Sequence, residues 1–163
     1  MGINSKSFKN FSRLDNILII GNGGRENSLA WAIQKNELVK KVFLTPGNAG
    51  SERISKCERI KIDINNKKEL VEKLDFLKVD LIVIGPEIPL AEGLADFLRK
   101  KDFKVFGPDK DGAKLEYSKS WAKEFMQDAN IPTAKFWKVN SLEEAKRIIH
   151  STSIPLVVKA DGL

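Results

Sequence analysis

Residues 17–27 read ILIIGNGGREN, four apolar residues followed at once by a glycine-rich segment. The apolar run predicts a buried strand, and the apolar spacing after it predicts a helix over Glu26–Lys35. Three glycines between a strand and a helix permit positive φ and let backbone N–H groups approach an anion. The helix start adds further N–H donors and the positive end of a dipole. We therefore expect this segment to bind a phosphate-bearing small molecule through Gly21, Asn22, Gly23, Gly24, Arg25 and Glu26. A turn that uses glycine for packing alone is the alternative.

A nicotinamide or flavin dinucleotide is disfavoured by two features of the same region. The dinucleotide fingerprint G-x-G-x-x-G requires a glycine at position 26, where this chain has Glu26. It also requires an acidic residue at the end of the second strand to bind ribose, and that strand ends Leu44-Thr45-Pro46-Gly47. An oxidoreductase is therefore a weaker hypothesis than a phosphate-binding protein of another class.

Strand-like apolar runs alternate with helical patterns up to Gly107. This alternation predicts an α/β fold with a doubly wound parallel sheet covered on both faces. The expected strands are Ile17–Ile20, Val42–Leu44, Arg59–Ile62, Leu81–Ile84 and Lys104–Phe106, and the later helices are Lys67–Leu77 and Leu90–Lys100.

The pattern changes after residue 117. We expect a helix over Ser118–Ala129, a strand over Phe136–Val139, a helix over Ser141–His150 and a strand over Leu156–Lys159. These elements predict the start of a second, incomplete domain. The expected organisation is a flexible tail over residues 1–15, a substrate-binding domain over 16–117 and the beginning of the second domain over 118–163.

Further glycine-containing loops follow other predicted strands. Because the carboxyl ends of parallel strands share one sheet edge, where open α/β sheets bind ligands, these loops become binding candidates. A plain surface turn is the alternative for each, since Pro, Gly and Asn are turn formers. The candidate residues are Pro46, Gly47, Asn48, Gly50, Gly85, Pro86 and Glu87, and the carboxylate of Glu87 is suited to accept hydrogen bonds from ribose hydroxyls.

Composition narrows the class of protein. Lys and Arg total 28 against 22 Asp and Glu, a net charge of +6, but the lysines are scattered and the aromatic residues dispersed, so we expect no nucleic-acid partner. No apolar run approaches the ~20 residues that cross a bilayer, and the first 15 residues lack the core of a secretory signal. Cys57 is the only cysteine and His150 the only histidine, so we expect no metal site within the chain. A cytoplasmic protein without membrane partners is predicted.

Five motifs in fixed order resemble those of phosphoribosylamine–glycine ligase, also called glycinamide ribonucleotide synthetase, of the ATP-grasp superfamily. The resemblance covers nearly all of residues 16–163 and implies a Rossmann-like pre-ATP-grasp domain followed by the start of an ATP-grasp domain. The motifs are Gly21-Asn22-Gly23-Gly24-Arg25-Glu26, Pro46-Gly47-Asn48-Ala49-Gly50, Gly85-Pro86-Glu87-x-Pro89-Leu90, Phe106-Gly107-Pro108 and Lys159-Ala160-Asp161-Gly162-Leu163.

The resemblance implies the ligation of glycine to 5-phosphoribosylamine in purine biosynthesis. ATP, as a substrate, would phosphorylate the glycine carboxylate, and the amine would displace phosphate to give glycinamide ribonucleotide and ADP. The family uses Mg²⁺ or Mn²⁺. Lys119 and Lys159 match the lysines that such enzymes present to the ATP phosphates, where a point charge offsets phosphate charge. No residue of the chain is assigned as catalytic.

Two departures from the family limit this expectation. Position 27 is Asn27 where the family usually has His, and Asn hydrogen-bonds but does not titrate near neutral pH. The chain is also shorter than family members, which run to roughly four hundred residues, so we expect an N-terminal fragment that binds substrate without turning it over. A non-catalytic phosphoribosyl- or nucleotide-binding module, and the front part of another ATP-grasp ligase, are the alternatives.

Overall fold

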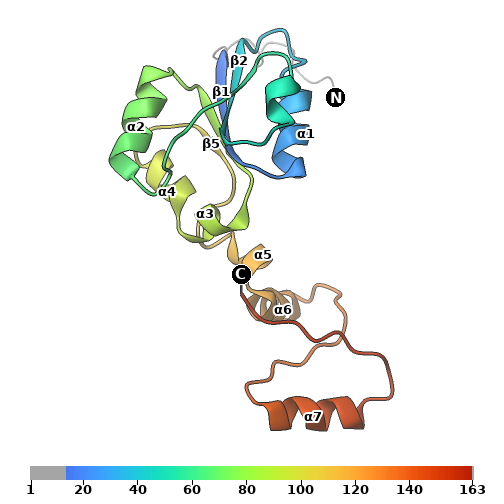
Figure 1. Cartoon of the computed structure of the whole chain (residues 1–163). Coiled ribbons are helices and arrows are strands. Elements are labelled where there is room, and N and C mark those ends of the chain that lie inside the picture. The colour runs from blue at the N-terminus through green and yellow to red at the C-terminus, as the bar shows by residue number, and fades with distance from the viewer. Residues whose placement is uncertain (1–13, 163) are drawn as a thin grey trace, which may run out of the picture.

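A computed structural model describes residues 14–162, in which five strands form one parallel sheet (Figure 1). The strand order is β3-β2-β1-β4-β5, so β1 lies at the centre and the order reverses between β1 and β4. Ile17 of β1 pairs with Val42 of β2 on one side and with Leu81 of β4 on the other. The strands are β1 (Asn16–Gly21), β2 (Lys41–Pro46), β3 (Cys57–Arg59), β4 (Leu81–Ile84) and β5 (Val105–Phe106). The predicted α/β class with a doubly wound parallel sheet is confirmed.

Helices cover both faces of the sheet because successive strand residues point to opposite sides. Ile17 and Ile19 pack on the face covered by α1, whereas Leu18 and Ile20 pack on the opposite face. Figure 1 shows α1 on one side of the sheet and α2 and α4 on the other. The helices of this part are α1 (Gly24–Ile33), α2 (Lys67–Phe76), α3 (Glu87–Ala91) and α4 (Leu94–Arg99), with a short 3-10 helix, η2 (Ser51–Arg53).

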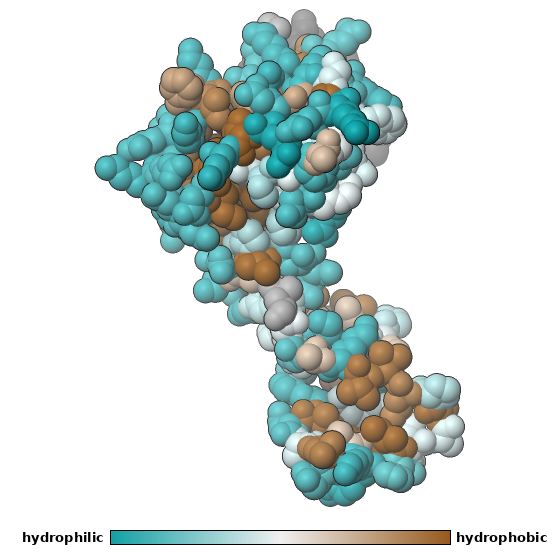
Figure 2. Space-filling view, in the orientation of Figure 1, coloured by the Kyte–Doolittle hydropathy of each residue, from teal (hydrophilic) through white to brown (hydrophobic). Residues whose placement is uncertain are grey.

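Three further helices follow the sheet: α5 (Lys114–Tyr117), α6 (Lys119–Asp128) and α7 (Leu142–Ser151). Ser118 and Ser141 cap α6 and α7, because each side chain accepts a hydrogen bond from the backbone three residues later. The predicted helices over these two regions are therefore confirmed to within one or two residues. None of the residues of α7 is buried, and hydrophobic side chains gather on this end of the surface (Figure 2).

Two predicted elements of the sheet domain are shifted or divided. The third strand spans Cys57–Arg59 instead of Arg59–Ile62, although the buried side chain of Ile62 still packs in the core. The helix predicted over Leu90–Lys100 is divided into α3 and α4, because Gly93 adopts φ +82° and breaks the helix. That backbone conformation suits glycine, which lacks a Cβ.

The two strands predicted late in the chain are wrong. Residues 136–139 and 156–159 have no strand partner in the described part of the chain, which contains no strand after β5. Val157 and Val158 are 81% and 73% exposed. An apolar run becomes a strand only where a neighbouring strand completes its hydrogen bonds, and none lies beside these runs.

Some of the predicted organisation is not tested by this structure. The expected tail over residues 1–15 lies mostly outside the described residues, as does Leu163 of the last motif. The boundary between residues 117 and 118 stays a prediction. No helix within residues 14–162 is long and apolar enough to cross a membrane.

The position of Leu18 generates a prediction about stability. Leu18 lies fully buried in the central strand, so Leu18→Ala should lower the free energy of unfolding by about 3 kcal/mol, through lost transfer energy and a cavity. Phe76→Ala is the control, because this side chain is 79% exposed and its loss should cost less than about 0.5 kcal/mol. Urea unfolding followed by circular dichroism measures both, and equal losses would contradict the assigned core.

Candidate functional site

The three predicted substrate loops meet at the carboxyl edge of the sheet. Gly21 ends β1, Pro46 ends β2 after a cis Thr45–Pro46 peptide bond, and Gly85 follows β4. The first two loops are joined directly, since the backbone N–H of Gly47 donates to the carbonyl of Gly21 at 3.1 Å. We call the region at the carboxyl ends of β1 and β4, where the strand order reverses, the crevice, because open α/β sheets bind ligands at such a point.

Glu26 occupies this crevice with a buried side chain. Glu26 is 4% exposed, and its Oε2 accepts a hydrogen bond of 2.8 Å from the backbone N–H of Gly23. Its Oε1 accepts a second bond of 3.0 Å from Nε of Arg25. A Cβ placed on Gly21 or Gly85 would overlap the carboxyl end of Glu26, so both glycines are needed for this close approach. One carboxylate therefore fills the crevice and holds two loops together.

Sequence reasoning missed this role for Glu26. The sequence places Glu26 three residues after Gly23, the spacing at which a glutamate folds back onto the start of its helix, and that spacing was the available signal. The bond from Gly23 also changes the expected anion site, because this N–H is already taken by protein. The N–H groups of the first turn of α1, at Gly24 and Arg25, are the donors that a helix leaves for an anion.

Asn48 fastens the second loop to the first. Its Nδ2 donates to the carbonyl of Asn22 at 2.9 Å, and its Oδ1 accepts from the backbone N–H of Gly50 at 2.8 Å. The amide side chain therefore spans from the glycine-rich loop to the turn at Gly50. Both polar atoms of the Asn48 side chain are thus bonded to the protein backbone, so this predicted residue holds the loops in place.

Asn27, the departure from the family pattern, faces the same turn. Ser51 is fully buried, and its hydroxyl donates to Oδ1 of Asn27 at 3.2 Å while accepting from the backbone N–H of Asn48 at 3.2 Å. Asn27 thus completes a hydrogen-bond chain within the protein. This contact requires an acceptor at position 27 but no titrating group.

Arg25 and Glu87 form an ion pair between the first and third loops. Nη1 of Arg25 lies 2.9 Å from Oε1 of Glu87, with the side chains 57% and 31% exposed. The hydrogen bond from Arg25 holds the pKa of Glu87 below its ordinary value. The bonds to Glu87 and Glu26 raise the pKa of Arg25 further above its already high value. The pair faces solvent more than Glu26 does, so a ligand can reach it.

The predicted ATP lysines lie on segments that meet elsewhere in the chain. Nζ of Lys119, at the start of α6, donates to the carbonyl of Gly162 at 3.3 Å. The carboxylate of Asp161 accepts from the backbone N–H of Ser120 at 3.0 Å and from the Ser120 hydroxyl. Lys159 is exposed just before this contact. The structure therefore brings the two motifs together, with Asp161 as the residue that joins them.

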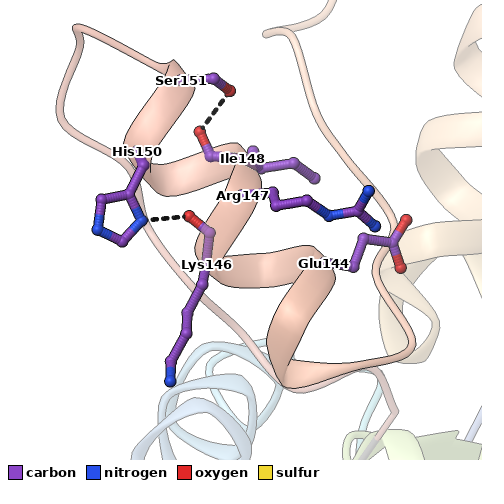
Figure 3. A pocket seen from close by; sticks show the side chains of 6 residues that line it. All are labelled: Glu144, Lys146, Arg147, Ile148, His150 and Ser151. Carbon is purple, nitrogen blue, oxygen red and sulfur yellow. Dashed lines mark hydrogen bonds between the residues drawn. The ribbon is translucent and has the colours of Figure 1, made fainter.

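No group of three Asp, Glu, His or Cys side chains that could hold a metal ion occurs within residues 14–162. A hollow of about 800 Å³ lies along α7, lined by residues of that helix and not by any predicted substrate or ATP residue. Figure 3 shows the side chains that line it. His150 lines it, and its Nδ1 lies 2.6 Å from the carbonyl of Lys146 in the same helix.

The packing of Glu26 predicts that substitution of Gly85 lowers stability and that substitution of Gly24 does not. Gly85→Ala should lower the free energy of unfolding by about 1–3 kcal/mol, because its methyl group would displace the Glu26 carboxylate. Gly24→Ala is the matched control, since, apart from its chain neighbours and the backbone of its own helix, a Cβ there meets no atom within 4 Å. Urea denaturation compares them. If both variants unfold like the original protein, Glu26 does not fill the crevice.

The contact at Asp161 predicts a shifted titration. Its pKa is lowered to about 2, chiefly by the hydrogen bond from the Ser120 hydroxyl. Folding lowers this pKa, so the contact stabilises the folded state fully at pH values above the ordinary pKa of Asp. This stabilisation is lost as the pH falls through about 2, where the carboxylate becomes protonated. Ser120→Ala should return the pKa toward about 3.9, measured by carboxyl carbon NMR. Ser28→Ala, which removes a hydroxyl bonded to Gly24 in α1, should leave it unchanged. An unshifted titration of Asp161 in the original protein would contradict the contact.

Solved structures with this fold support the assignment of the architecture. The chain superposes with a TM-score of 0.60 on a structure described as glycinamide-RNase-transformylase T from Mycobacterium tuberculosis, covering 86% of this chain and 40% of that one at 17% identity. N5-carboxyaminoimidazole ribonucleotide synthetase from Thermotoga maritima gives a TM-score of 0.56 at 20% identity, covering 82% of this chain and 36% of that one. At these identities the likeness concerns the fold alone.

Sequence comparison is more specific. Curated proteins named phosphoribosylamine–glycine ligase are 40% identical over 147 residues in Nostoc sp. and 42% identical over 150 residues in Pseudomonas aeruginosa. The matches cover 90% and 91% of this chain but 35% and 34% of the relatives, so the chain spans about a third of their length. The family model for the phosphoribosylglycinamide synthetase N domain matches residues 15–116, and the model for the ATP-grasp (A) domain of the same enzyme matches residues 117–163. The N-domain match alone covers more than half of the chain, which therefore belongs to the phosphoribosylglycinamide synthetase family.

Proposed function

We propose that this chain forms the phosphoribosylamine side of a phosphoribosylamine–glycine ligase. The observation that carries the proposal is the joining of three ligand-type loops at the crevice between β1 and β4. Hydrogen bonds of Asn48 hold the first two loops together, and contacts of Arg25 and Glu26 hold the first and third. A preformed site of this kind suits a small ligand with several polar groups. Relatives named phosphoribosylamine–glycine ligase are 40% and 42% identical over stretches that cover 90% and 91% of this chain.

The proposed reaction of the whole protein has two steps. The γ-phosphoryl group of ATP is transferred to the carboxylate of glycine, which gives an acyl phosphate and ADP. The amine of 5-phosphoribosylamine then attacks the acyl carbon, inorganic phosphate leaves, and glycinamide ribonucleotide forms. Because the chain spans about a third of its relatives, its own residues are assigned only binding and orienting roles in these steps.

Within the chain, the substrate is proposed to lie across the crevice. Its phosphate would accept hydrogen bonds from the first-turn N–H groups of α1, at the positive end of the helix dipole. Its ribose hydroxyls would donate to Glu87, at the start of α3. Gly24 leaves room for this arrangement, because, apart from its chain neighbours and the backbone of its own helix, no atom lies within 4 Å of the position of a Cβ there.

The ATP side is proposed to involve Lys119 and Lys159. Two ammonium groups near the phosphates would offset charge that develops during phosphoryl transfer. The hydrogen bonds of Asp161 and Lys119 support this assignment, because they place the start of α6 beside the segment that follows Lys159.

The protein is proposed to act in the cytoplasm.

A divalent cation, Mg²⁺ or Mn²⁺, is proposed to accompany ATP in the whole protein. A structural neighbour, the biotin carboxylase domain of a Hydrogenobacter thermophilus carboxylase, is described in complex with MgADP. The described residues of this chain offer no group of three ligands for such an ion, so no step derived for this chain passes through it.

The proposed substrate site predicts binding of glycinamide ribonucleotide, the stable product. Calorimetry should detect binding to the chain, and Gly24→Val should weaken it by about tenfold or more, because the side chain enters the space left for the phosphate. Lys68→Val is the control, since it also places valine in a helix but at an exposed position of α2. Absence of binding to the original chain at millimolar concentration would contradict the proposed function, and an unaffected Gly24→Val variant would contradict the proposed phosphate position.

A further inference from the structure

We propose that Arg25 and Glu87 form a latch, an ion pair that opens most readily to a ligand that replaces both partners at once, with a phosphate on Arg25 and ribose hydroxyls on Glu87. The two side chains thereby select for a ligand that carries both groups, and against free phosphate. This inference rests on the proposed function, because it names how the same site distinguishes a phosphoribosyl compound from simpler anions.

The position of the pair is the first observation. Arg25 lies in the first turn of α1, directly after the loop of β1, and Glu87 is the first residue of α3, directly after the loop of β4. These strands are neighbours in the sheet and mark the reversal of strand order. The 2.9 Å contact between Nη1 of Arg25 and Oε1 of Glu87 therefore spans the crevice in which a ligand would lie.

The second observation is that one side of the latch is fixed and the other is not. Nε of Arg25 is bonded to Oε1 of Glu26, whose side chain is 5% exposed and fills the crevice. When Glu87 is released, that bond keeps Arg25 in place and leaves its Nη1 without the carboxylate. The Arg25–Glu87 contact is partly solvent-exposed, and pairs of this kind contribute little net free energy, so a ligand can replace it.

The chemistry of the two groups sets the selectivity. A guanidinium matches phosphate oxygens in charge and geometry, whereas a carboxylate accepts hydrogen bonds from adjacent hydroxyls. Free phosphate binds Arg25 only by breaking its ion pair with Glu87, and it brings no ribose hydroxyl to the released Glu87 carboxylate. A phosphoribosyl ligand gives each group a new partner. Discrimination therefore comes from the group that the wrong ligand leaves unpaired.

The test compares two probes, inorganic phosphate and ribose 5-phosphate, by calorimetry on the full chain. In Glu87→Gln the latch is open from the start, because a neutral amide does not hold the guanidinium by charge. Phosphate should bind about twofold to fivefold more tightly than to the original protein, the measured range for an exposed ion pair. Ribose 5-phosphate should bind about tenfold more weakly, because hydrogen bonds to a charged acceptor are lost. Opposite directions for the two probes are the signature of the latch.

Glu58→Gln is the matched control. It removes one negative charge from the pair that Glu58 forms with Lys41 at 2.7 Å, so it changes the net charge equally without touching the crevice. Both probes should bind to it as to the original protein. Glu87→Asp is a second variant, since its shorter carboxylate should also release Arg25 and strengthen phosphate binding. Thermal unfolding checks that each variant is folded.

The outcomes separate this inference from the proposed function. If the original chain binds ribose 5-phosphate but phosphate affinity does not rise in Glu87→Gln or Glu87→Asp, the latch is wrong and the proposed substrate site stands. Weaker binding of both probes by Glu87→Gln likewise overturns the latch. If the original chain binds neither ribose 5-phosphate nor glycinamide ribonucleotide, the proposed function and the latch fall together.

Discussion

The buried carboxylate of Glu26 lies where the strand order of the sheet reverses, and the geometry of the candidate site depends on this carboxylate. Its oxygens bind the backbone of Gly23 and the side chain of Arg25, and its carboxyl end leaves no space for a side chain at Gly21 or Gly85. A dinucleotide-binding loop has a glycine at this position for close helix–strand packing, and the absence of a side chain leaves space beside the backbone. Here the protein's own carboxylate takes that space, and an anion at the proposed site would lie further out, at the first turn of α1.

The other side chains of the candidate site are arranged outward from Glu26. Arg25 is anchored by Glu26 and reaches outward to Glu87, while Asn48 and Asn27 secure the turn beside the glycine-rich loop. The side chains of Glu26 and Ser51 are buried and the Arg25–Glu87 ion pair is partly exposed, so the site has a rigid base and a replaceable surface. Such an arrangement would favour selective binding at the proposed site, because a ligand would reorganise only the outermost contacts.

The sequence predicted those features that depend on neighbouring residues and missed those that depend on distant ones. The alternating apolar runs predicted the parallel sheet, and the order of strand and loop predicted which loops share its carboxyl edge. The division of one predicted helix at Gly93 had a local signal in that glycine. The bond from Gly23 to Glu26 also had a local signal in the spacing of the two residues. The packing of Glu26 against Gly85 had none, because β4 brings Gly85 beside β1 only in the folded sheet. The strands predicted over residues 136–139 and 156–159 were wrong for the same reason, since local apolar character does not reveal whether a partner strand is present.

The central position of β1 also has a consequence for how the chain is made. This strand is synthesised before either of its neighbours, yet Ile17 is paired with Val42 on one side and Leu81 on the other. Its apolar residues therefore emerge from the ribosome long before β4 can cover them, and an unpaired apolar strand is prone to associate with other chains. The glycines and charged residues that follow directly after Ile20 interrupt this apolar run, as residues flanking aggregation-prone strands commonly do. The loop that shapes the ligand site thus also limits the length of the segment that is exposed during synthesis.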